Sequence, residues 1–317
     1  MKGNLINVML MVVLGFTLCH ALPAMADGDV RAFMTNSGNL KIIGDNKSNQ
    51  IKVTNNGSGN IRVEGIGTTI NDEAGVTDFT STSGDVVNGK LDINLKRGNN
   101  QVEIDDIAVT RNLQLKFAHG DNTIGIFNTT VSGNASLKMG NGDNFIAIAG
   151  AVEGTWINNK LTIKTGKGAD KIEITDCVAV GGKSVVKTLS GDDLINLRGD
   201  FFGPLTLDTG KGNDNLYISQ YTNSNRVNIL LGNDDDVILI ASTSSLMGRV
   251  TINGGKGADF LTRDNDLTGF FIPITKSISI DASQDVDDRP DEITARMVQD
   301  YNVRGGDPAD ISCPLAP

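Results

Sequence analysis

The sequence repeats itself about every 22 residues, and this repeat leaves few possible folds. An Asn or Asp followed by spaced apolar positions recurs at intervals of 22, 22, 26, 23, 21, 22 and 23 residues. These anchor residues are Asn100, Asn122, Asn144, Asp170, Asp193, Asp214, Asp236 and Asp259. A fixed period of this length indicates a repeat architecture, because one unit is too small to bury its own apolar face and must stack on its neighbours.

Each repeat contains two segments in which apolar and polar residues alternate. Positions nine and seven before the anchor are mostly Leu, Ile or Val, and so are positions two and four after it. Alternation with a period of two is typical of a strand with one buried face. The sequence therefore predicts an all-β fold: a right-handed parallel β-helix, or β-solenoid, whose coils run strand, Gly-rich turn, strand and longer loop. About eleven coils of about 22 residues are expected.

The two ends of the chain differ from the repeats. Residues 1–26 have a basic start, an apolar run and the cleavage site Ala24-Met25-Ala26, which predicts a secretory signal peptide. We expect irregular coils and a cap in 27–90, regular coils in 91–280, and an acidic C-terminal cap or tail in 281–317. An earlier anchor match at Asn49 lies 51 residues before Asn100, and this interval is expected to hold two looser coils.

The charge of the chain limits its partners and location. Without the leader, 27 basic and 38 acidic side chains give a net charge of -11. Nucleic acid is therefore an unsuitable partner, because it requires a basic face. No further apolar run approaches 18 residues, so we expect no membrane span after signal cleavage. The expected location is secreted, cell-surface or periplasmic, and Cys177 and Cys313 are either a disulfide pair or free thiols.

The turn between the two strands is rich in Gly two residues before the anchor. Gly adopts positive φ without a steric penalty, which a tight turn requires. The predicted turn glycines are Gly98, Gly120, Gly142, Gly168, Gly191, Gly212 and Gly257, and Asp234 is the exception. One of these turns, "GGKGADFLT" at 254–262, fits the calcium-binding nonapeptide of RTX proteins. The resemblance covers a turn only, because RTX coils take about 18 residues and carry the motif on both turns.

Stacked carboxylates at the turn need something to offset their repulsion. Neighbouring coils lie about 4.8 Å apart, so like charges there repel appreciably. Backbone N–H groups, basic residues three before the anchor, or a calcium ion could offset it. The candidate calcium ligands are Asp170, Asp192, Asp193, Asp214, Asp235, Asp236 and Asp259. Asn at the earlier anchors favours a polar ladder without metal, so the cofactor prediction is none or calcium.

A row of lysines lies six residues before four successive anchors. These are Lys116, Lys138, Lys164 and Lys187, after which Asp208 ends the row. Such a stripe could bind an anionic glycan such as a uronate polymer. The alternative is a solvated face that keeps the sheet soluble.

Three segments share one coil pattern: "LTIKTGKGADKIEI" (161–174), "LTLDTGKGNDNLYI" (205–218) and "SGNLKIIGDNKSNQIKV" (37–53). In this pattern the chain resembles bacterial exported β-helix repeat proteins of the broad pectin-lyase-like group. The resemblance implies that one exposed sheet binds polysaccharide. Lyases of the group use carboxylate-held calcium with a basic residue, and hydrolases use paired carboxylates. No local cluster stands out from the repeated rows, so the catalytic residues are unknown.

The sequence favours an exported, non-catalytic β-helix that acts in surface, matrix or adhesive binding. Its expected partner is an extracellular polysaccharide or a cell-surface matrix. The first alternative is a lyase or hydrolase acting on an anionic glycan. A weaker alternative is a calcium-stabilised repeat module, and ice or mineral binding would require a flat, regular Thr array that is absent from the sequence.

Overall fold

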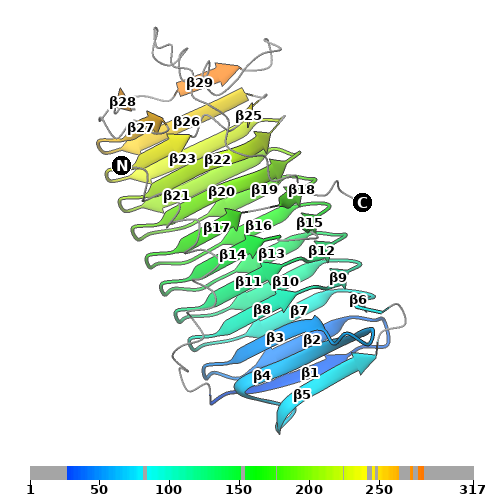
Figure 1. The fold of residues 1–317 in the computed structure, drawn as a ribbon. Helices are drawn as coiled ribbons and strands as arrows, with labels where there is room; N and C mark the ends of the chain where they lie inside the picture. The colour runs from blue at the N-terminus through cyan, green and yellow to red at the C-terminus, as the bar shows by residue number, and fades with distance from the viewer. Residues whose placement is uncertain are drawn as a thin grey trace, which may run out of the picture.

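The computed structural model is an all-β, parallel β-solenoid with about 22 residues per turn. It describes residues 27–80, 84–150, 154–175, 177–223, 225–240, 245–246, 249–263, 272–273 and 278–281. Figure 1 shows the coils stacked along one axis. The predicted all-β, parallel β-solenoid is confirmed, while about eleven coils were too many. The expected signal peptide, the tail beyond Asp281 and Cys313 lie outside the described residues.

The first strand of each coil leads into the Gly-rich turn. From one coil to the next these strands pair in parallel and in register. They are β2 (Leu40–Gly44), β7 (Leu91–Leu95), β10 (Leu113–Phe117), β13 (Ala135–Lys138), β16 (Leu161–Lys164), β19 (Ser184–Lys187), β21 (Leu205–Lys211), β23 (Val227–Asn233) and β26 (Arg249–Lys256).

The second strand of each coil follows the turn and forms its own parallel stack. These strands are β3 (Gln50–Asn55), β8 (Gln101–Asp105), β11 (Thr123–Phe127), β14 (Phe145–Ala149), β17 (Lys171–Thr175), β20 (Leu194–Phe201), β22 (Asn215–Asn223), β24 (Val237–Ile240) and β27 (Phe260–Arg263).

The segment that returns to the next coil contains a third strand, where the sequence pattern predicted only a loop. These short strands also pair in parallel, and the far ends of β20 and β22 continue their stack. They are β6 (Val86–Val87), β9 (Ala108–Val109), β12 (Thr130–Val131), β15 (Thr155–Ile157), β18 (Val178–Val180) and β25 (Ser245–Leu246). Strands of two or three residues are too short for alternation to reveal them.

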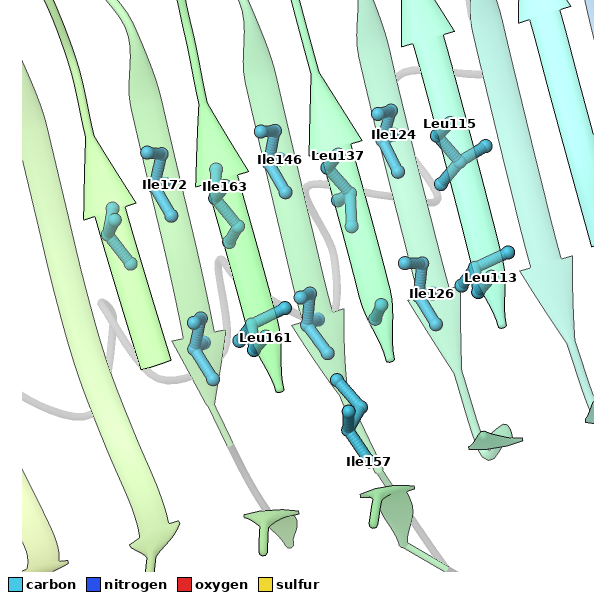
Figure 2. Packing of buried hydrophobic residues seen from close by; sticks show 14 of the residues in the cluster. Leu113, Leu115, Ile124, Ile126, Leu137, Ile146, Ile157, Leu161, Ile163 and Ile172 are labelled. Carbon is cyan, nitrogen blue, oxygen red and sulfur yellow. The ribbon is translucent and has the colours of Figure 1, made fainter. Parts of the chain in front are cut away.

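The predicted apolar columns form the core. The rows that begin at Leu91 and Ile93 before the anchor, and at Val102 and Ile104 after it, are at most 5 % exposed throughout their described members. Figure 2 shows side chains of these rows, including Leu137 of β13, lined up between the stacks. Because each coil presents the same apolar positions at the same register, burial continues from coil to coil.

The N-terminal part differs from the two looser coils that the sequence predicted. Strand β3 pairs directly with β8, and the backbone N–H of Asn49 reaches Asn100 at 3.0 Å, so the interval holds a single coil. The additional residues form β4 (Asn60–Ile70) and β5 (Glu73–Thr80), an antiparallel hairpin whose first strand pairs with β3. Alternation alone does not distinguish antiparallel from parallel strands, which explains the error.

Antiparallel strands pair with the terminal coils at both ends (Figure 1). β1 (Asp29–Met34) pairs with β2, while β28 (Ile272–Pro273) and β29 (Ile278–Asp281) pair with β27 and β26. Cys177, between β17 and β18, is disulfide-bonded, and its partner is outside the part of the chain that the structure describes.

Candidate functional site

The Gly-rich turn brings most of the predicted site residues together along one edge of the solenoid. The turn glycines have φ between +110° and +137°, a region that favours Gly. A Cβ at Gly120, Gly142, Gly168, Gly191 or Gly212 would also collide with the carbonyl oxygen of the turn glycine one coil earlier. The row therefore requires Gly for its backbone conformation and for the close approach between coils.

The anchors form a continuous buried stack, which we call the inner column. Its members are Asn49, Asn100, Asn122, Asn144, Asp170, Asp193, Asp214, Asp236 and Asp259, each at most 2 % exposed. Each backbone N–H before the last donates to the side-chain Oδ1 of the next member, at 2.7–3.3 Å. The column thus joins successive coils through a polar row parallel to the apolar core.

In the Asn part of the inner column, the side-chain amide completes the hydrogen bonding. Asn100 Nδ2 donates to Asn122 Oδ1 at 3.0 Å and to the carbonyl oxygen of Gly98 at 2.8 Å. Asn122 and Asn144 make the same two kinds of bond, to the next anchor and to the turn glycine. From Asn100 to Asn144, buried amide donors and acceptors are therefore matched from coil to coil, as buried polar groups require. At the first position, Asn49 Oδ1 accepts no hydrogen bond among the described residues.

In the Asp part, one oxygen of every carboxyl group remains unmatched. Oδ2 of Asp170, Asp193, Asp214, Asp236 and Asp259 is buried and accepts no hydrogen bond among the described residues. Burial raises the pKa of Asp193 and Asp236 to about 7 and that of Asp214 to about 6, and backbone N–H donors offset part of the effect. Burial also raises the pKa of Asp170 and Asp259.

Threonines accompany three of the five aspartates, a feature that the sequence reasoning missed; Leu231 and Gly254 take this position before Asp236 and Asp259. Thr165, Thr188 and Thr209 lie five residues before Asp170, Asp193 and Asp214, and all three are buried. The equivalent positions before the Asn anchors are Leu95, Phe117 and Met139. The coincidence of Thr with Asp was visible in the sequence and indicates that the carboxyl groups have particular polar neighbours.

An outer column occupies the position immediately before the anchor and faces solvent. Its members are Asn99, Asp121, Asp143, Asp192, Asn213 and Asp235. Here the N–H of the following coil donates back to the side chain, at 2.8–3.0 Å, and Ala169 interrupts the row. The structure therefore separates the candidate calcium ligands: Asp192 and Asp235 belong to the outer column and the other five to the inner column.

In both columns, side-chain oxygens accept hydrogen bonds from backbone N–H groups of neighbouring coils. Calcium prefers six to eight oxygen ligands around one point. Among the residues that the structure describes, no group of three or more His, Cys, Asp or Glu side chains is arranged to hold a metal ion. We identify neither column as a metal site on this geometry, and calcium binding stays a prediction from the sequence.

The lysine row lies on the outer face of the first-strand stack, on β10, β13, β16 and β19. Register pairs Lys116 with Lys138, Lys138 with Lys164, and Lys164 with Lys187. The first three side chains are exposed, and no described acidic side chain forms an ion pair with them. Lys187 instead pairs with Asp208 of the next coil at 2.5 Å. The accessible part of the row is therefore Lys116, Lys138 and Lys164.

Small side chains flank the accessible lysines on the side of the turn. Ala118, Gly140 and Gly166 lie two residues beyond Lys116, Lys138 and Lys164. The exposed lysines therefore have little side-chain bulk beside them in the sequence on this side.

Comparison of the chain with models of protein families, with curated proteins and with solved structures finds no match. Within the described ranges there is also no helix long and apolar enough to cross a membrane.

Proposed function

We propose that this protein is an exported, non-catalytic parallel β-helix that binds an anionic polysaccharide of a cell surface or extracellular matrix. The observation that supports this function is the exposed part of the lysine row, Lys116, Lys138 and Lys164, on three successive coils. We also propose that the coil is right-handed and that the protein is related to bacterial exported proteins of the pectin-lyase-like group, because its coil sequences resemble theirs.

The spacing of the lysines suits a linear polymer that lies along the solenoid axis. In-register coils place the charges about 4.8 Å apart. A polyuronate carries one carboxylate on each sugar, so successive sugars could meet successive lysines. The small neighbours Ala118, Gly140 and Gly166 add little side-chain bulk beside the exposed lysines. Because the remainder of the chain is acidic, attraction is restricted to this strip and should weaken with added salt.

Binding to polygalacturonate and alginate by calorimetry at low salt tests this function. We expect K116A/K138A/K164A to weaken binding about tenfold or more, because each lost contact contributes up to about 1 kcal/mol. The matched control K167A/K211A/K256A removes the same charge from exposed turn positions that do not lie on successive coils. Equal losses in both variants, or unchanged binding in the first, would contradict a specific row.

The same incubations test the non-catalytic part of the proposal. Unsaturated sugar ends would indicate a lyase, and new reducing ends without unsaturation would indicate a hydrolase. We expect neither product from the purified mature protein. Turnover that disappears in Lys164→Ala or Asp170→Ala would replace the binding function with an enzymatic one.

A further inference from the structure

The Asn and Asp parts of the inner column differ in their hydrogen bonding. From Asn100 to Asn144 the side-chain amides are matched, whereas each Asp carboxyl group leaves one buried oxygen without a partner among the described residues. Asn144 matches its neighbours with one acceptor oxygen and one amide group that donates hydrogen bonds. Asp170 presents the same Oδ1 acceptor, but an oxygen stands in place of the amide. If that oxygen is ionised, it is a buried acceptor without a donor, and such groups are unfavourable.

Two of the three threonines beside the column direct their hydrogen away from the carboxyl groups, whereas the hydroxyl of Thr165 has no other partner among the described residues and can donate to Asp170. Thr188 Oγ1 donates to the carbonyl oxygen of Thr209 at 2.6 Å, and Thr209 Oγ1 donates to that of Leu231 at 2.5 Å. A hydroxyl group has one hydrogen, so each of these oxygens is left as an acceptor. Asp193 and Asp214, which adjoin these hydroxyls, therefore need a hydrogen of their own.

We infer that Asp170, Asp193, Asp214, Asp236 and Asp259 form a proton-binding column, in which protonated carboxyl groups take the role that the Asn amides have in the preceding coils. The Oδ2–H group of each protonated Asp donates where the Asn amide donates, toward the next anchor, the turn carbonyl or the neighbouring Thr oxygen. The ligand is a proton exchanged with solvent, and no covalent bond of the chain changes. This inference is independent of the lysine row and of the proposed function.

The electrostatic surroundings favour the protonated form. The charged groups that act on the column are carboxylates of the turns: Asp143 beside Asp170, Asp192 and Asp234 beside Asp214, Asp234 beside Asp236, and Asp235 beside Asp259. The aspartates of the column also repel one another, as Asp170 and Asp214 act on Asp193. The turn lysines Lys167, Lys211 and Lys256 are exposed, and none forms an ion pair with the column in the described part of the chain.

The sign of the pH dependence follows from the raised pKa values. A carboxyl group with an ordinary value of 3.8 and a folded value of about 6 to 7 binds its proton more tightly in the folded chain. Its contribution to stability is fully present below its unfolded pKa, decreases as the pH rises toward the folded pKa, and is lost above it. The coils that contain the Asp column should therefore loosen as the pH rises from about 5 to about 8.

Thermal melting of the full mature chain across this pH range tests the inference. We expect the melting temperature to fall by about 10 °C, since several groups release protons together. In D193N/D214N/D236N the amides replace the acids permanently, so the dependence should nearly vanish and the variant should melt above the parent at pH 8. The matched control D143N/D192N/D235N changes the same chemistry in the exposed outer column. It should retain most of the dependence of the parent, because burial contributes more to the raised pKa values than these neighbouring carboxylates do.

Three outcomes would overturn the proton-binding column. One is equal pH dependence in the inner-column variant and the parent. Another is that millimolar calcium restores the stability of the parent at pH 8 but has no such effect on the inner-column variant. That result would place a cation in the inner column. The third is the absence, near pH 6, of an infrared carbonyl band from protonated carboxyl groups in the parent. This measurement uses the parent alone, so it does not depend on whether the variant folds.

Discussion

At the scale of single residues, the turn is determined by positive φ and by close packing between coils. Gly191 has φ of +134° and lies against the carbonyl group of Gly168. Asp234 is the one member of this row with a side chain; its φ is +80°, and its Oδ2 accepts the N–H of Gly212 at 3.2 Å. A hydrogen bond from the preceding coil and a smaller φ thus accompany Asp at a position that is otherwise Gly.

Gly191→Ala is expected to destabilise the protein by about 3 kcal/mol, because it adds both backbone strain and a collision with Gly168. The control is Gly57→Ala, at a turn with φ of +74° where no heavy atom lies within 4 Å of the added Cβ. That change should destabilise by only about 1 kcal/mol, from strain alone. Urea unfolding followed by circular dichroism measures both, and equal losses would show that the contact between coils contributes nothing.

At the scale of the elements, the inner column connects neighbouring strand–turn units. Asn122 Oδ1 accepts both the N–H and the Nδ2–H of Asn100, at 3.1 and 3.0 Å. We expect Asn122→Ala to destabilise by about 3 kcal/mol, because it leaves two buried donors without an acceptor. Asn112→Ala removes an equivalent acceptor of the solvent-exposed N–H of Asn134 and should change stability by about 0.5 kcal/mol. Urea unfolding compares them, and similar effects would contradict a special role for the buried column.

The strands also show which parts of the fold could be predicted from the sequence alone. The anchors from Asn100 to Asp259 predicted the register of both long strand stacks and the buried rows, because every coil repeats one pattern. The third strands and the hairpin β4–β5 were not predicted, since they are either too short or alternate just as coil strands do. The hydrogen bonds of the inner column depend on which neighbour each N–H faces. Only the three-dimensional stacking determines this.

At the scale of the whole molecule, both ends of the solenoid are paired with antiparallel strands. A parallel stack would otherwise present an unpaired strand and an apolar surface at each end, a template for further association. At the N-terminal end, β4 pairs with β3 and contributes Ile61, Val63 and Ile70 to the core. Strand β1 pairs with β2 in the same way. The hairpin is thus an insertion that closes the end of the stack.

Deletion of residues 56–84 tests this closing role directly. It leaves 22 residues between Asn49 and Asn100, the length of a regular coil, and keeps Val86 in register with Ala108. We expect the variant to keep its β-sheet circular dichroism but to self-associate with increasing concentration, because the edge of β3 and the apolar end become exposed. Light scattering after size exclusion, with the chain without this deletion as control, measures this. A folded variant with the same concentration dependence as the control would show that the hairpin does not protect the end.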